Sequence, residues 1–208
     1  MKYVKVISLF LAMSLLFAFA ACGNGGKSTD QTTAEQGSDN AAPSADDDKP
    51  IEMLAAYFPY DETSVKTAKL VSELTGAKLF ALETQNGYPD DSELRLSQAK
   101  DEAEKNLRPA LKNKLSSLSS CVVVFVCTPL WENNLPMAFY TFFEDYDLRD
   151  RVIVPFCASE SSDGAARVSS LIKDKLPASL VLDGMTISPT AEPDKNAINT
   201  FIDDSLNN

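Results

Sequence analysis

The chain has 208 residues, a formal net charge of −11 and no histidine. The negative charge argues against nucleic acid as a partner, because nucleic acids select basic surfaces. The lack of histidine excludes catalytic triads and metal sites built on an imidazole, and it excludes a histidine general base.

Residues 1–21 have the pattern of a secretory signal. Lys2 and Lys5 precede an apolar stretch that is too short for a membrane span. The stretch ends in Phe-Ala-Ala-Cys, and this ending, followed by Gly-Asn-Gly-Gly, resembles the lipobox of bacterial lipoproteins. The resemblance implies lipidation of Cys22 and an extracytoplasmic protein that is lipid-anchored to the bacterial cell membrane. An ordinary signal peptide with an incidental cysteine is the alternative.

Residues 22–50 follow as a predicted tether. After Cys22 the segment is rich in Gly, Ser, Thr, Asp, Ala and Asn, and it holds no aromatic or β-branched aliphatic residue. Such a composition cannot bury enough apolar surface to offset the entropy lost on ordering. We therefore expect one folded domain, residues 51–208, which is large enough for a hydrophobic core.

Strand and helix patterns alternate along this domain. Strands are expected at residues 51–58, 77–82, 121–127, 151–157 and 179–187. Helices are expected at residues 64–75, 91–114 (interrupted at Arg108-Pro109), 135–145, 163–176 and 193–206. The alternation predicts an α/β fold with a doubly wound five-stranded parallel sheet and right-handed crossovers.

The run CVVVFVCTPLW, residues 121–131, is the strongest single signal. A strand that is apolar at every position has no solvent face, so we expect it at the centre of the sheet. Ligands of open α/β sheets bind at the carboxyl ends of such strands. Trp131, the only tryptophan, follows this strand. It is expected to line a cleft at the sheet edge, or alternatively to plug that edge.

Three loops are expected to meet at the carboxyl edge if the strand order is 2-1-3-4-5: residues 59–64, 128–136 and 158–164. The first loop leads into a helix whose free N–H groups and dipole favour an anion such as phosphate. Asp61 and Glu62 also fit ordinary residues at the start of a helix, where they would interact with the dipole themselves.

Three cysteines lie inside the domain, in apolar strand-like runs. Cys121, Cys127 and Cys157 have a spacing that fits no zinc pattern. We expect them to be buried as small hydrophobic residues. A disulfide between Cys127 and Cys157 is the alternative in an exported protein.

Several motifs, in the right order, resemble the small bacterial flavodoxin-like family. They are Ala56-Tyr57-Phe58 with Tyr60, Tyr88-Pro89 with Ala99, Glu102 and Arg108-Pro109, Pro129-Leu130-Trp131 with Pro136-Met137, the run Phe139, Phe142, Phe143, Glu144, Tyr146 and Asp147, and VIVPFC at residues 152–157. The resemblance covers nearly all of residues 51–208. It implies the flavodoxin fold and FMN held noncovalently at the sheet edge.

By this resemblance the protein is an electron carrier or a flavin-dependent reductase. Residues 61–64 would hold the phosphate, Trp131 would lie against or beside the isoalloxazine, and residues 158–161 would form the third wall. The expected cofactor-binding residues are Pro59, Tyr60, Asp61, Glu62, Thr63, Ser64, Thr128, Pro129, Leu130, Trp131, Glu132, Asn133, Ala158, Ser159 and Glu160. No metal site is expected, and the redox partner or acceptor cannot be named.

The three loops depart from the family pattern. Asp61 and Glu62 stand where the family has Ser-Gly, Glu132 and Asn133 replace Trp-Gly, and residues 159–162 replace a glycine-rich loop. A carboxylate near a phosphate dianion opposes binding. The alternative function is therefore a binding module that has kept the fold and lost FMN. Its acidic edge would bind a cation or a basic partner, if Asp61, Glu62, Glu132 and Glu160 cluster.

The anchor assignment gives a first testable prediction. Replacing Cys22 with Ala removes the thiol that would carry the lipid, so the variant is expected to leave the membrane fraction. Cell fractionation followed by immunoblotting measures this. Membrane association that survives the substitution unchanged would contradict the lipoprotein assignment.

Overall fold

The computed structural model describes residues 52–207, and the predicted signal, Cys22 and the tether lie outside them. The elements, in chain order, are β1 (Met53–Tyr57), α2 (Glu62–Thr75), β2 (Lys78–Ala81), α3 (Ser92–Glu104), β3 (Val123–Pro129), α4 (Met137–Asp145), β4 (Val152–Ala158), α5 (Gly164–Lys175), β5 (Leu180–Val181), β6 (Met185–Ile187) and α6 (Lys195–Asn207). None of the described helices is long and apolar enough to cross a membrane.

The strands form one parallel sheet in the order β2-β1-β3-β4-β5, with β6 also paired to β4. The predicted α/β class, the parallel pairing and the strand order are confirmed. All seven residues of β3 are buried, as expected of a strand covered on both faces. The same register places Tyr57, Cys127 and Phe156 side by side, so the strand ends meet along one edge.

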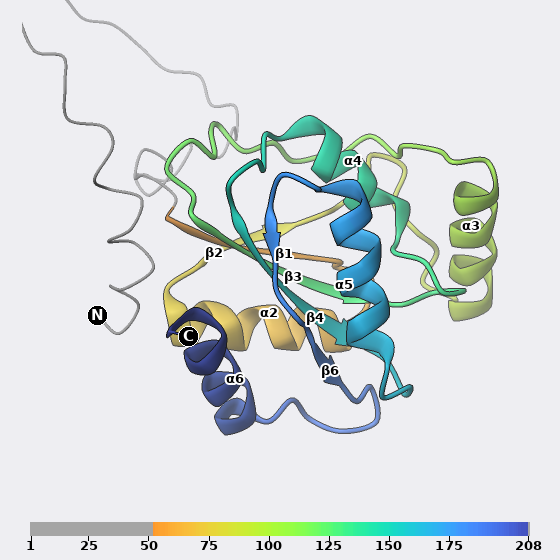
Figure 1. The fold of residues 1–208 in the computed structure, drawn as a ribbon. Helices are drawn as coiled ribbons and strands as arrows, with labels where there is room; N and C mark the ends of the chain where they lie inside the picture. Colours follow the sequence, from red (N-terminus) through yellow and green to blue (C-terminus); the bar gives the residue numbers. More distant parts are fainter. Residues whose placement is uncertain (1–51, 208) are drawn as a thin grey trace, which may run out of the picture.

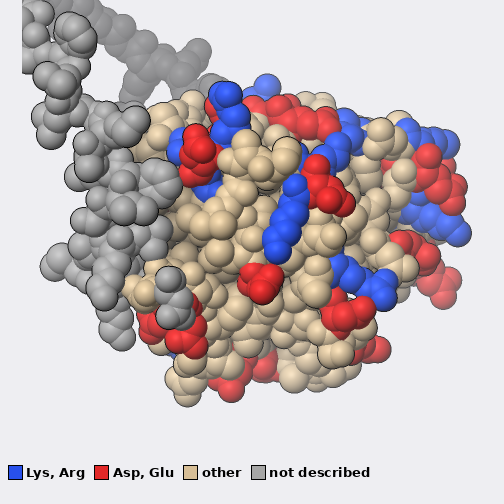
Figure 2. All heavy atoms as spheres, viewed as in Figure 1, with Lys and Arg blue, Asp and Glu red and all other residues tan. Residues whose placement is uncertain are grey.

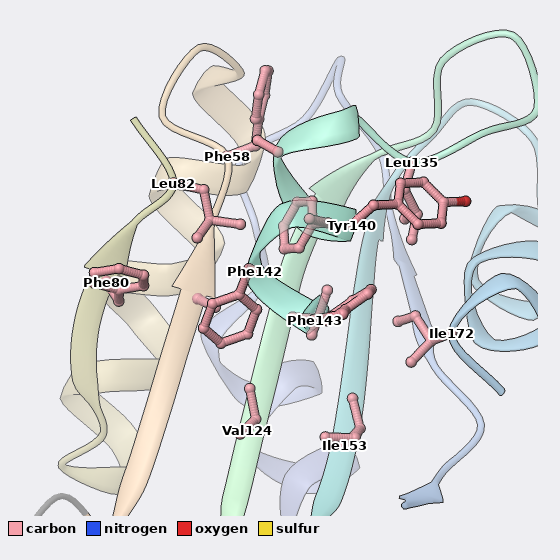
Figure 3. Packing of buried hydrophobic residues seen from close by; sticks show 14 of the residues in the cluster. Phe58, Phe80, Leu82, Val124, Leu135, Tyr140, Phe142, Phe143, Ile153 and Ile172 are labelled. Carbon is pink, nitrogen blue, oxygen red and sulfur yellow. The ribbon is translucent and has the colours of Figure 1, made fainter. Parts of the chain in front are cut away.

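Helices cover both faces of the sheet (Figure 1). One face packs on α2 and α6, through residues such as Val71 and Ile198. The other packs on α4 and α5, where Phe142 lies over Val124 and near Phe80 (Figure 3). Apolar residues therefore fill the space between the sheet and the helices on both faces. This packing holds the helices in place relative to the carboxyl ends of the strands.

The predicted fifth strand is divided into β5 and β6. Ile153 pairs with Val181 and Phe156 pairs with Met185, so three steps along β4 correspond to four along its partner. This is a bulge of one extra residue. The Ile153 carbonyl accepts from Leu182 N–H, and alternate residues face the same neighbour, so Pro155 also faces this strand. Proline has no N–H to donate there, which explains why the ladder breaks opposite Pro155.

Helix α3 is shorter than the predicted helix over residues 91–114. It ends at Glu104, and Asn106 follows with a φ of 50°. The chain then runs extended, and Leu111 forms an antiparallel bridge with Thr84. The chain thus leaves the helix at Asn106, before Pro109 is reached, and buries Leu111 instead. Pro109 would in any case have interrupted a helix that continued.

Few contacts hold α3 to the rest of the domain. Of its thirteen residues, Ala99 and Glu102 are buried, so most of the helix is solvated. The Glu102 carboxylate accepts a short hydrogen bond from the Tyr88 hydroxyl and another, of 2.9 Å, from the Gln98 amide. Burial, followed by the neighbouring Glu102, raises the pKa of Tyr88 well above its ordinary value. The resemblance motif included Tyr88 and Glu102 but gave no role for either.

The three described cysteines are buried and free, as small hydrophobic residues. Cys127 belongs to the cluster of residues under α2 and α6, whereas Cys157 belongs to the cluster on the opposite face. Successive strand side chains alternate between faces, so the sheet itself separates the two thiols. The alternative of a Cys127–Cys157 disulfide is wrong.

Gly184 sits in the bulge, and its replacement by Ala is expected to destabilise the domain. A Cβ there would lie 2.8 Å from the Pro155 carbonyl oxygen, which is backbone and cannot move aside cheaply. Such overpacking costs about 1–3 kcal/mol. Urea unfolding measures it, with Asp183→Ala as the control, since that side chain is fully exposed in the same bulge. Equal stability of Gly184→Ala and the natural protein would contradict the steric explanation.

Tyr88→Phe is expected to lower the free energy of unfolding by about 1–3 kcal/mol at neutral pH, because it leaves a buried carboxylate with one donor fewer. The raised pKa of Tyr88 adds a pH dependence. The contribution of the Tyr88 hydroxyl to the free energy of unfolding is complete below about pH 10, the pKa of tyrosine in the unfolded chain. It is lost as the pH rises above that value, because the tyrosine then ionises in the unfolded chain before it does so in the folded one.

The gap between the natural protein and Tyr88→Phe should therefore narrow above pH ~10, in urea unfolding measured over a pH series. A difference in free energy of unfolding that stays constant would show that folding does not raise the pKa of the Tyr88 hydroxyl.

Candidate functional site

The three predicted loops meet at the carboxyl edge of the sheet. Phe58 N–H donates to the Cys127 carbonyl at 3.1 Å, so the β1–α2 loop starts directly beside the end of β3. Thr128 and Pro129 pair with Cys157 and Ala158, so the next two loops also start side by side. This edge lies at the β1/β3 point where the strand order reverses, the place at which doubly wound sheets bind ligands. The flavodoxin fold is itself a standard example of that rule.

Four aromatic rings gather at this edge. The Trp131 ring meets Phe58 edge to face, with ring centroids 4.9 Å apart, and Tyr60 lies 5.2 Å from Phe58 and 4.9 Å from Tyr88. Phe58 is fully buried and Tyr88 nearly so, whereas Tyr60 and Trp131 are half-buried. Trp131 thus plugs the end of β1 through its contact with Phe58 and still keeps part of its ring accessible at the edge.

Asp61 begins α2 as its N-cap. Its backbone is extended, with a φ of −124°, and its carboxylate Oδ2 accepts from both the backbone N–H and the hydroxyl of Ser64, each at 2.7 Å. Thr63 and Ser64 are buried in the first turn. The interpretation of Asp61 as an ordinary helix-starting residue is confirmed. The same contact places a negative charge where the phosphate was expected.

Glu62 points to other partners. It is exposed and forms an ion pair with Lys66, which lowers the pKa of the Glu62 carboxyl. Lys66 also pairs with Glu192, from the loop before α6. Lys66, in the first half of α2, is therefore already paired with two carboxylates.

The β3–α4 loop contains a tight turn. The backbone groups of Trp131 and Asn134 exchange hydrogen bonds at 3.0 and 2.8 Å, and the two residues between them, Glu132 and Asn133, have φ values of 48° and 62°. Positive φ at both central positions is typical of a type I′ turn. The exposed Asn133 accepts from Arg167 on α5, which ties this turn to the next loop. Pro59 and Leu130 are half-buried beside the rings, and a shallow hollow adjoins Trp131 on the α3 side.

The β4–α5 loop is held by its own hydrogen bonds. Ser159 accepts from the Ser161 N–H, and the Ser161 hydroxyl donates to Asp163. Ala158 and Ser159 are half-buried at the end of β4, and Glu160 is exposed. Burial, followed by the charge of Asp61, raises the pKa of the Cys157 thiol to about 12. Cys157 therefore stays a neutral thiol beneath this loop.

The acidic residues at the edge do not form a metal centre. Asp61 faces Ser64, Glu62 faces Lys66, and no group of three or more possible ligand side chains occurs within residues 52–207. The cation form of the alternative function thus has no support in this part of the chain. Figure 2 shows acidic and basic side chains interspersed on the face it displays, without a continuous basic patch.

Solved structures share this architecture. A protein of Bacteroides eggerthii assigned as a flavoprotein has 25% sequence identity and a TM-score of 0.65, over 74% of this chain and 97% of that one. An analogous protein of Bacteroides uniformis has 24% identity and a TM-score of 0.63, over 74% and 99%. A flavoprotein of Lactobacillus acidophilus, solved in complex with FMN, has 18% identity and a TM-score of 0.53, over 65% and 91%.

No curated protein matches the chain significantly. The family model described as flavodoxin matches residues 52–204, which is nearly the whole described domain. The chain therefore belongs to the flavodoxin family.

Proposed function

We propose that this protein binds a flavin at the carboxyl edge of its sheet and works as an electron carrier or a flavin-dependent reductase. The observation that carries the proposal is the pair of half-buried rings, Tyr60 and Trp131, at the β1/β3 switch point. A bound flavin would supply one- or two-electron transfer, and the protein would supply binding, orientation and electrostatics.

The predicted lipid anchor and tether would place this function at the cell membrane. Lipidation of Cys22 would hold the domain on the outer side of the bacterial cell membrane, within reach of a redox partner or a small acceptor there. Support comes from the sequence of residues 1–50, which lies outside the described residues.

FMN is the flavin that the family resemblance implies, and the edge fits one half of it. A planar heteroaromatic ring can stack on or beside Trp131, since aromatic pairs favour offset and edge-to-face contacts. The phosphate half does not fit, because the Asp61 carboxylate already occupies the start of α2. The β1–α2 loop also lacks the glycine that would let backbone approach a phosphate.

A second candidate function follows from the same observation. If the Asp61 cap and the ring contacts close the edge completely, the domain is a flavodoxin-fold binding module without flavin. The half-buried state of Tyr60 and Trp131 favours the flavin proposal over this one, since a closed edge would bury both rings.

Flavin binding is tested by titrating the purified protein with FMN and with riboflavin. Trp131 is the only tryptophan, so its fluorescence reports on one position, and a flavin beside it should quench the emission strongly. Trp131→Ala should weaken binding about tenfold, while Trp131→Phe, which keeps a ring, should weaken it less. Binding seen by absorbance with unchanged Trp131 emission would remove Trp131 from the site. No binding of either flavin would favour the module without flavin.

A further inference from the structure

We propose that the site selects a flavin without a phosphate, of the riboflavin type, and that Asp61 is the residue that makes this selection. The inference rests on the proposed function, because it presumes that the edge binds a flavin ring. It goes further by naming the ligand class and the residue that decides it.

The first step is the state of the α2 N-terminus. In doubly wound folds the free N–H groups of such a helix bind phosphate. Here Asp61 Oδ2 accepts from both the backbone N–H and the hydroxyl of Ser64 at 2.7 Å. Two donors that a phosphate would use are thus satisfied within the chain. A phosphate must either displace the carboxylate or lie against it.

The second step is the chemistry of the remaining oxygen. Among the described residues Asp61 Oδ1 has no hydrogen bond, and the side chain is half-buried rather than covered. An ionised carboxylate only accepts hydrogen bonds, and so does a phosphate dianion. Two acceptors that face each other have no proton to share. The hydroxyl groups of a ribityl chain are donors, and the last of them matches Oδ1 where the phosphate of FMN does not.

The third step is the charge around this position. Lys66, five residues along α2, is paired with both Glu62 and Glu192, so it cannot neutralise a phosphate without leaving them. The field of Asp61 also reaches the end of β4, where it helps to keep the Cys157 thiol protonated. The Asp61 charge at this corner therefore opposes a second anion. It should disfavour FMN relative to riboflavin about tenfold or more.

Isothermal titration of the full protein with riboflavin and with FMN tests the proposal. The key variant is Asp61→Asn, because asparagine is as good an N-cap as aspartate. It removes the charge and puts an NH2 donor, which a ribityl hydroxyl or a phosphate can both accept from, in place of Oδ1. Asp194→Asn is the matched control. Asp194 caps α6 through the N–H groups of Asn196 and Ala197, and the adjacent Lys195 pairs with Glu73 in the last turn of α2, at the end opposite to Asp61.

The natural protein is expected to bind riboflavin at least about tenfold more tightly than FMN. Asp61→Asn should strengthen FMN binding about tenfold and change riboflavin binding much less, so that the preference nearly disappears. Asp194→Asn, which changes the net charge equally, should keep the preference. Thermal unfolding checks that both variants fold, and Asp61→Ser, which also caps, repeats the test if asparagine perturbs the helix.

The alternative outcomes are distinct. FMN bound by the natural protein as tightly as riboflavin would overturn the selection and leave flavin binding intact. A preference for riboflavin that persists in both Asp61 variants would overturn the role of Asp61. Failure of the natural protein and of the Asp61 variants to bind either flavin would overturn the proposed function itself, and the selection with it.

Discussion

The burial of β3 on both faces is the constraint on which the rest of the structure depends. Each residue from Val123 to Pro129 is covered, so neither face can meet water, and helices must pack on both sides. Helical crossovers on both faces require parallel neighbours, which bring the carboxyl ends of β1, β3 and β4 to one edge. The position of the site is therefore a consequence of how the core is covered.

A second constraint acts at the far side of the sheet. Pro155 has no N–H to donate to the fifth strand, and that strand contains one extra residue opposite it. Gly184 in this bulge lets the backbone lie close to the Pro155 carbonyl. The bulge separates β5 from β6 but leaves Ile187 in register with Ala158, at the edge. The last strand thus still supports the β4–α5 loop.

The sequence was sufficient for the fold because its signals are strong and local. An unbroken apolar run marks β3, and helical periodicity marks the layers that cover it. The division of the fifth strand could not be predicted, since it depends on which neighbour Pro155 faces, and that follows from register. The end of α3 depends in the same way on the burial of Leu111 against a distant segment.

The position of the candidate site could be predicted from the sequence, whereas most of its side-chain contacts could not. Trp131 follows β3 directly, so its position at the edge follows from the strand itself. The contact between Tyr88 and Glu102 joins a loop to a helix fourteen residues away, and spacing gives no signal for such a pair. For Asp61 both interpretations were available, a helix cap or a phosphate contact, because the same free N–H groups serve either purpose.

The Asp61 cap changes what a ligand can contribute to this fold. When the start of a helix is left unsatisfied, a bound phosphate completes it, and ligand and fold stabilise each other. Here the carboxylate satisfies Ser64 within the chain, so α2 is complete without any ligand. The flavin proposed for this edge would then bind through the aromatic rings and through hydrogen-bond donors that it offers to Asp61. Because this loop keeps the family's position but supplies its own anion, we expect the ligand's charge to decide between flavins that carry the same ring.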